Sequence, residues 1–158
     1  MRSLATKAVV ALLAVALAAS AATAGSMLTP TQYRAKLNAM CRANTPQIKI
    51  LEADFRRAQK AQDGRAMGIA LGRLIVLTLR QDARLRATPV PSRLKTKMLP
   101  TIRLLRQADG IMREILVDAT ARRVRAMVTG LASLQRMTPS INHHLDAAGL
   151  RDCGSNQA

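Results

Sequence analysis

The chain has 158 residues, with 25 Lys or Arg against 9 Asp or Glu, and therefore a formal net charge of +16. Its only aromatic residues besides histidine, Tyr33 and Phe55, are too few to stack nucleic-acid bases, so specific nucleic-acid recognition is not expected. The chain contains no Gly-rich phosphate loop, nucleophile elbow or Cys-x-x-Cys-His motif, which excludes the enzyme and haem classes that need them.

Residues 1–24 predict a secretory signal peptide. Arg2 and Lys7 supply a positively charged start, residues 8–19 are an unbroken apolar run, and Ala22-Thr23-Ala24 offers a cleavage site. An uncleaved membrane anchor is the alternative, but the run is short and rich in Ala for a span of about 20 residues. We therefore expect a secreted protein, whether extracellular, periplasmic or associated with the cell envelope, without a transmembrane span in the mature chain.

The first helix is expected to open at Pro30, after a short leader at residues 25–30. Thr45-Pro46 interrupts its apolar stripe without changing the phase, which predicts either a kink or a restart capped by Thr45. The stripe alternates spacings of four and three, as in a helix packed against others. Its members are Leu37, Cys41, Asn44, Ile48, Leu51, Phe55, Ala58 and Gln62.

Asp63-Gly64 predicts the first turn, with Asp63 as the cap of a second helix that runs to about Ala87. Residues 69–79 are apolar over more of the helix than one core-facing stripe requires. Gly68 and Gly72 lie four residues apart and would let a neighbouring helix approach closely. A deeply buried central helix, a dimer face and a ligand groove are the three interpretations of this segment.

Residues 88–91, which include two prolines, end the second helix, and Ser92 is expected to cap the third. The seam of the third helix, meaning the row of residues that should face the core, keeps its spacing through Asp109-Gly110. The chain should therefore not turn there. Its phase breaks before Val124, which predicts a turn near residues 118–120. The members of this seam are Leu94, Met98, Thr101, Leu105, Ala108, Met112 and Ile115, and Pro100 should kink the helix.

The fourth helix is expected to end at Gly149, a residue suited to close a helix. Pro139 should kink it or start its last segment, and residues 154–158 are read as a frayed tail. The seam of the fourth helix consists of Val124, Met127, Leu131, Leu134, Thr138, Ile141, Leu145 and Ala148.

Four helices joined by short turns predict an all-α fold, an antiparallel up-down-up-down four-helix bundle with Pro-kinked helices over residues 31–153. Cys41 and Cys153 are the only cysteines, so a bond within an exported chain must join these two. Two free thiols or a bond between chains are the alternatives. The pairing would staple the end of the chain onto the first helix.

Positive charge is spread over all four predicted helices and is densest at Arg56, Arg57, Arg122, Arg123 and Arg125. We expect these arginines to bind an anionic partner, such as an envelope polymer, a lipid headgroup or an acidic protein. A solvated Arg-rich surface without a partner is the alternative. The sequence does not fix the oligomeric state.

No catalytic, metal or cofactor site is predicted. The adjacent His143 and His144 point about 100° apart on a helix. His143 with Asp146 would be only half of a metal site. Glu52 and Glu114 are flanked by basic residues, so ion pairs are expected there. Only two buried acidic residues facing each other would require an enzyme to be reconsidered.

The sequence therefore predicts an exported, non-catalytic, cationic helical bundle that binds an anionic envelope or extracellular component. The alternative function is a carrier that holds a small apolar ligand between its helices, near the wide apolar surface of the second helix.

Overall fold

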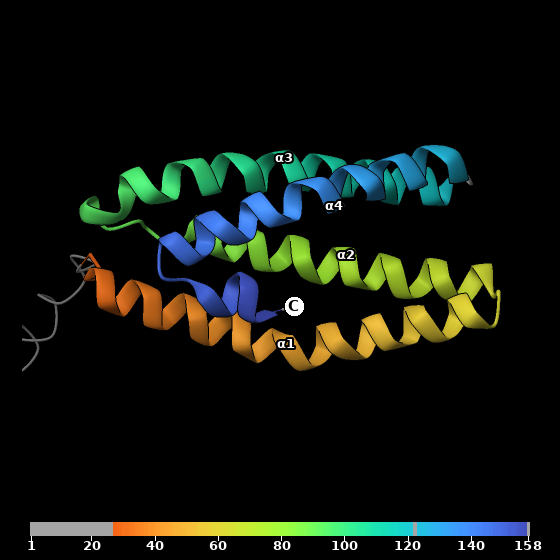
Figure 1. Ribbon diagram of the computed structural model, residues 1–158, viewed down its shortest axis with the longest axis horizontal. Helices are drawn as coiled ribbons and strands as arrows, with labels where there is room; N and C mark the ends of the chain where they lie inside the picture. Colours follow the sequence, from red (N-terminus) through yellow and green to blue (C-terminus); the bar gives the residue numbers. More distant parts are fainter. Residues whose placement is uncertain (1–26, 122, 158) are drawn as a thin grey trace, which may run out of the picture.

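The computed structural model describes residues 27–121 and 123–157, so the predicted signal peptide and Arg122 lie outside the described residues. Every regular element in these two ranges is helical, which confirms the all-α fold class (Figure 1). The four α-helices are α1 (Pro30–Lys60), α2 (Gly64–Ala87), α3 (Lys95–Thr120) and α4 (Val124–Ala147). Three 3-10 turns complete the fold, η1 (Ser92–Leu94), η2 (Arg151–Cys153) and η3 (Ser155–Gln157).

Local hydrogen bonds explain where several helices begin and end. Thr29 and Gln32 form a reciprocal capping box at the start of α1, in which the Thr29 hydroxyl accepts from the backbone N–H of Gln32 at 3.2 Å. Asp63 caps α2 as predicted, since its Oδ1 accepts from the Ala66 amide at 2.9 Å. Gly149 follows α4 with a φ of 82°, a left-handed conformation that glycine adopts without strain.

The predicted cap at Ser92 is wrong, and so is the restart at Thr45, one of the two alternatives for Pro46. Thr45 lies inside a continuous α1, and its hydroxyl donates to the Cys41 carbonyl at 3.0 Å instead of starting a new helix. Ser92 opens the 3-10 turn η1, so α3 begins only at Lys95 and has no side-chain cap. Pro46, Pro100 and Pro139 are all accommodated inside helices.

The turn between α3 and α4 lies slightly later than predicted. Helix α3 continues through Asp118 to Thr120, and the Thr120 hydroxyl donates to the Val117 carbonyl at 2.8 Å. The Arg123 amide then donates to the Asp118 carbonyl at 2.8 Å and closes the turn. The change of phase in the apolar pattern therefore located the turn to within about one helical turn.

The helices pack as two pairs, α1 with α2 and α3 with α4, which meet mainly through α2 and α3 (Figure 1). Gly130 brings α4 close to α3, because a Cβ atom there would lie 2.7 Å from Cγ1 of Ile115. At one end all four helices and the C-terminal segment share an apolar core. We name it the closed-end core, and its buried members are Tyr33, Leu37, Cys41, Leu85, Leu94, Met98, Leu105, Leu145, Ala148, Leu150 and Cys153.

The C-terminal segment is fastened to α1 by several contacts, and η2 packs against both α1 and α4. The predicted disulfide is confirmed, with Cys41 and Cys153 bonded at 2.02 Å and buried. One turn earlier on α1, the Asn38 amide donates to the Gly149 carbonyl at 3.0 Å. One turn before that, Arg34 Nε donates to the Ala148 carbonyl at 2.8 Å. Successive turns of α1 thus hold the last residues of the chain.

Replacing both Cys41 and Cys153 with Ala should lower the free energy of unfolding by about 4 to 5 kcal/mol, because the bond closes a loop of 112 residues. Denaturant titrations of the oxidised wild-type protein and of the variant would measure this loss. A reducing agent should lower the stability of the wild-type protein and leave that of the variant unchanged. Equal stabilities of variant and oxidised wild-type protein would show that the bond is not a staple.

Candidate functional site

The apolar seam of α4 is largely uncovered. Of its predicted members only Leu145 and Ala148, next to the C-terminal segment, are buried. Leu131 and Leu134 are half-buried, and Val124 is 62% exposed. The predicted burial is wrong over most of α4, because the C-terminal segment separates α4 from α1 at the closed end and the two helix pairs diverge beyond it (Figure 1).

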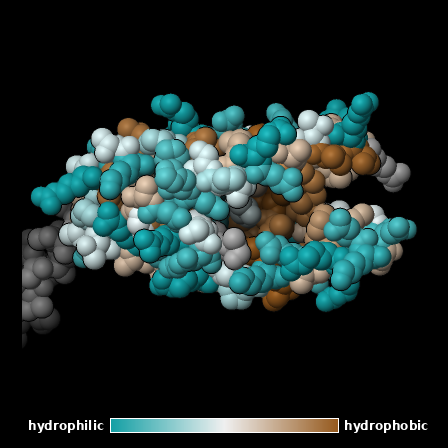
Figure 2. All heavy atoms as spheres, in the orientation of Figure 1, coloured by the Kyte–Doolittle hydropathy of each residue, from teal (hydrophilic) through white to brown (hydrophobic). Residues whose placement is uncertain are grey.

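An outer cavity of about 540 Å³ lies between the two pairs, near their turns. Figure 2 shows hydrophobic side chains lining a hollow between the pairs at this end of the molecule. Gly68 contributes to the opening, because a Cβ atom there would meet nothing within 4 Å. The close helix approach predicted at Gly68 is therefore wrong. The lining residues are Phe55, Gly64, Met67, Gly68 and Leu71 from one pair, and Asp118, Ala119, Val124, Met127, Val128 and Leu131 from the other.

An inner cavity of about 290 Å³ adjoins the outer one, and Leu71 and Leu131 line both. It lies between α2, α3 and α4 and reaches Cys153. We name the two cavities together the groove. The wall of the inner cavity is mostly aliphatic, and its polar members are Thr78, Gln81, Asp82, Thr138 and Asn142.

Two buried acidic residues face each other beside the inner cavity, Asp82 on α2 and Asp109 on α3, each 6% exposed. Arg86 Nη2 pairs with Asp109 Oδ2 at 2.5 Å. Burial, the charge of Asp109 and a hydrogen bond with Asp109 raise the pKa of Asp82 to about 8, against an opposing effect of Arg86. Asp82 therefore carries a proton at neutral pH and shares it with Asp109. We name these three residues the acid pair and its arginine.

Asp82 and Asp109 are two buried acidic residues that face each other, which is the arrangement for which an enzyme has to be reconsidered. Asp109 is occupied by Arg86, and of the two carboxyl groups only Asp82 lines the cavity. Two-carboxylate catalysis needs both groups to reach the substrate from positions with different proton affinities. The arrangement therefore presents one carboxyl group, that of Asp82, to the cavity.

The sequence contains a signal for Asp82 that was overlooked. Leu71, Ile75, Thr78, Asp82 and Leu85 are spaced four, three, four and three, so Asp82 lies on the seam of the second helix. An acidic residue on a seam indicates a buried charge that needs a partner. Asp109 lies off the third seam, and no local pattern marks it as that partner.

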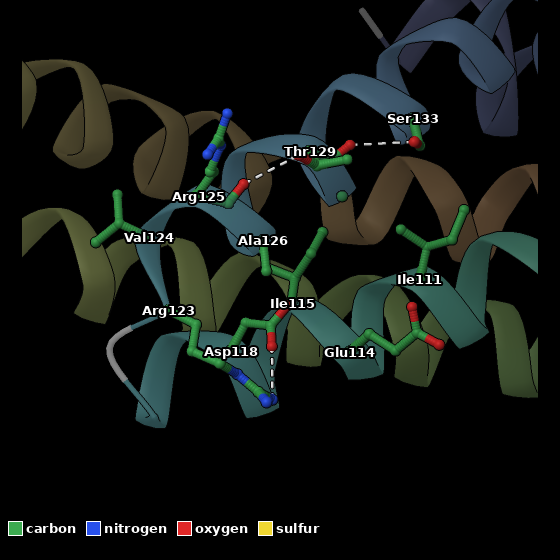
Figure 3. A pocket seen from close by; sticks show the side chains of 11 residues that line it. Ile111, Glu114, Ile115, Asp118, Arg123, Val124, Arg125, Ala126, Thr129 and Ser133 are labelled. Atoms are coloured by element: carbon green, nitrogen blue, oxygen red, sulfur yellow. Dashed lines mark hydrogen bonds and ion pairs between the residues drawn. The ribbon is translucent and has the colours of Figure 1, made fainter.

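The end of the molecule opposite the closed-end core, where the two helix pairs diverge, is named the open end. The predicted anion-binding arginines lie near this end but on different helix pairs. Arg56 and Arg57, on α1, approach Glu52 at 3.9 Å and Asp54 at 3.4 Å. Arg123 pairs with Asp118 at 2.7 Å, and Figure 3 shows Arg125 turned away from that pair. Arg122 lies outside the described residues. The structure does not gather the four described arginines into one cluster.

The histidines lie side by side on α4, with the ring centroids of His143 and His144 5.7 Å apart. Within the described ranges no three His, Cys, Asp or Glu residues are grouped so as to hold a metal ion. None of the helices that the structure describes is both long enough and apolar enough to cross a membrane.

The stability of the protein should fall as pH rises from about 4 to about 8. Unfolded Asp82 loses its proton near its ordinary pKa of 3.8, whereas folded Asp82 keeps the proton until about pH 8. The contribution of Asp82 to the free energy of unfolding is thus complete below its unfolded pKa of 3.8, and it is lost as the pH rises to about 8. Asp82→Asn should flatten this slope in denaturant titrations across the range. Asp63→Asn, which removes the charge of an exposed cap and keeps an oxygen that can accept from the Ala66 N–H, should leave the slope unchanged. An unchanged slope in Asp82→Asn would contradict the shared proton.

No protein-family model, curated protein or solved structure matches this chain. The function is therefore inferred from the groove, the acid pair and the surface charge.

Proposed function

We propose that this is an exported, non-catalytic binding protein that takes an apolar chain into the groove between its helix pairs. The half-exposed seam of α4 carries the proposal, because Leu131, Leu134 and their neighbours face a cavity instead of a packed helix. Folded proteins rarely leave an apolar surface of this kind uncovered unless it binds something. The carrier function, second in the sequence analysis, thus becomes the first.

The proposal includes the finer architecture and the export of the chain. We take the four helices to alternate in direction, up-down-up-down, with bends at Pro46, Pro100 and Pro139. Support for the alternation comes from the closed-end core, which joins the starts of α1 and α3 to the ends of α2 and α4. A disulfide is compatible with an extracellular location. The signal peptide predicted at residues 1–24 would deliver the chain there.

The chemistry of the groove matches a flexible aliphatic chain. Each buried methylene group of such a chain contributes about 0.8 kcal/mol, and the ordering of chain and protein offsets part of the sum. The outer and inner cavities adjoin at Leu71 and Leu131, which line both. A chain of several methylene groups can therefore enter by the outer cavity and reach the inner one.

Leu131→Trp should weaken the binding of diphenylhexatriene, a neutral apolar fluorophore, about tenfold or more. The indole would fill the passage between the two cavities, and Leu131 is half-buried, so the fold can accommodate it. Ile50→Trp is the matched control, because Ile50 is 61% exposed and lines neither cavity of the groove. Fluorescence titration would measure both affinities. Undiminished binding by Leu131→Trp would place the probe elsewhere and contradict the proposal.

Association with an anionic envelope component is the second candidate function. Arg57 and Arg125 flank the open end on opposite helix pairs, where they would bring the groove to an anionic surface. The ion pairs of Arg57 and Arg123 with Asp54 and Asp118 reduce the charge available there.

Binding to vesicles of anionic phosphatidylglycerol should weaken steeply as salt rises, because surface charges are screened. The double variant Arg57→Gln/Arg125→Gln should lose about thirtyfold in affinity, at about 1 kcal/mol for each basic residue near the membrane surface. Arg93→Gln/Lys95→Gln, at the opposite end, is the charge-matched control. Co-sedimentation would measure both, and equal losses would show that the open end has no special part in the contact.

A further inference from the structure

The inner end of the groove has one ionisable side chain in its wall, Asp82. Around it the cavity is lined by aliphatic side chains, uncharged polar groups and the disulfide-bonded Cys153. The charged groups that act on Asp82 are Asp109 across from it on α3 and Arg86 on its own helix. The polar side chains that helix α4 contributes to this cavity, Thr138 and Asn142, are uncharged.

The acid pair and its arginine need one more positive charge when both carboxyl groups are ionised. Arg86 pairs with Asp109 Oδ2 at 2.5 Å and compensates one carboxylate. The other oxygen, Asp109 Oδ1, is buried and receives no hydrogen bond from an N–H group or a hydroxyl among the described residues. A proton on Asp82 satisfies both carboxyl groups, since it supplies the missing charge and the missing donor.

A ligand that brings a positive charge and its own N–H donors can replace that proton. We propose that the inner end of the groove recognises a protonated amine, so that the groove binds a long-chain amphiphile with its ammonium group against Asp82 and its chain toward the open end. This inference rests on the proposed function, and it names the class of ligand. Asp82 and Leu71 are eleven residues apart on α2, about 16 Å along the helix, which leaves room for an extended chain.

The same geometry rejects a carboxylate head at the inner end. A fatty-acid carboxylate there would add another negative charge to the acid pair in a poorly solvated site. Its chain can still enter from the open end with its head left in solvent. The site therefore discriminates between amphiphiles by their head groups, and the apolar chain alone does not decide the order of affinity.

Amine binding is coupled to proton release. At neutral pH the ammonium ion already carries its proton, so its pairing with the Asp82 carboxylate expels one proton from the acid pair to solvent. Affinity for the amine should rise with pH and level off once Asp82 is ionised without ligand. An aliphatic amine stays charged throughout this range, because its pKa is about 10.

The test compares dodecylamine, dodecanol and dodecanoate on the mature protein in about 0.15 M salt, which limits nonspecific attraction of the anion. Titration calorimetry near pH 7 in buffers with different ionisation enthalpies gives the affinities and the protons exchanged. We expect the wild-type protein to prefer dodecylamine over dodecanoate by at least about tenfold and to release about one proton for each amine bound.

Asp82→Asn should abolish the proton release and most of the preference. Asp118→Asn, which removes a carboxylate from the outer cavity, should change neither and is the matched control. Loss of the preference in Asp118→Asn instead would place the ammonium group at the open end.

Equal affinities of wild-type protein for amine and carboxylate, or binding without proton release, would overturn the inference but leave a groove that binds chains. Failure of all three probes would overturn the proposed function itself. The wild-type proton release decides the question even if Asp82→Asn does not fold.

Discussion

The attachment of the C-terminal segment to α1 is the constraint on which the rest of the structure depends. Arg34, Asn38 and Cys41 lie on successive turns of α1 and hold residues 148–153 through three hydrogen bonds and the disulfide. These contacts all lie in the first half of α1, so they close the molecule at one end only. Beyond them the helix pairs meet mainly through α2 and α3, and the seam of α4 lines a groove. The same staple thus secures the fold and leaves the opposite end open.

A layer of buried polar side chains lies beside the closed-end core, whose members Leu85, Leu105, Leu145 and Cys153 also line the inner cavity. The Asn44 amide donates to Gln81 Oε1 at 2.9 Å, and Gln81 Nε2 donates to Cys41 Sγ at 3.4 Å. Asp82 follows Gln81 directly and extends the layer to Asp109 on α3. Buried polar groups must be paired, so this layer fixes the register of α1, α2 and α3 against one another. It also places an ionisable group, Asp82, in the wall of the inner cavity.

The two proposed functions use the same end of the molecule, where the groove opens and basic residues lie. The open end carries the mouth of the groove, and basic residues such as Arg57 and Arg125 lie on the helix pairs that form it. In these two proposals, a positive field draws the protein to anionic surfaces, whereas the inner carboxyl pair selects against anionic head groups. Attraction at long range and selection at short range therefore act on different parts of the same molecule.

Local features of the sequence determined the four helices, their caps at Asp63 and Gly149, and the pairing of its only two cysteines. All seven predicted seam positions of α3, from Leu94 to Ile115, are buried, because α3 has neighbours along its whole length. Only the tertiary structure decided that most of the α4 seam stays uncovered, that Gly68 opens a cavity, and that Asp82 meets Asp109. Periodicity shows which side of a helix is apolar, but burial and charge pairing depend on a second helix far away in the chain.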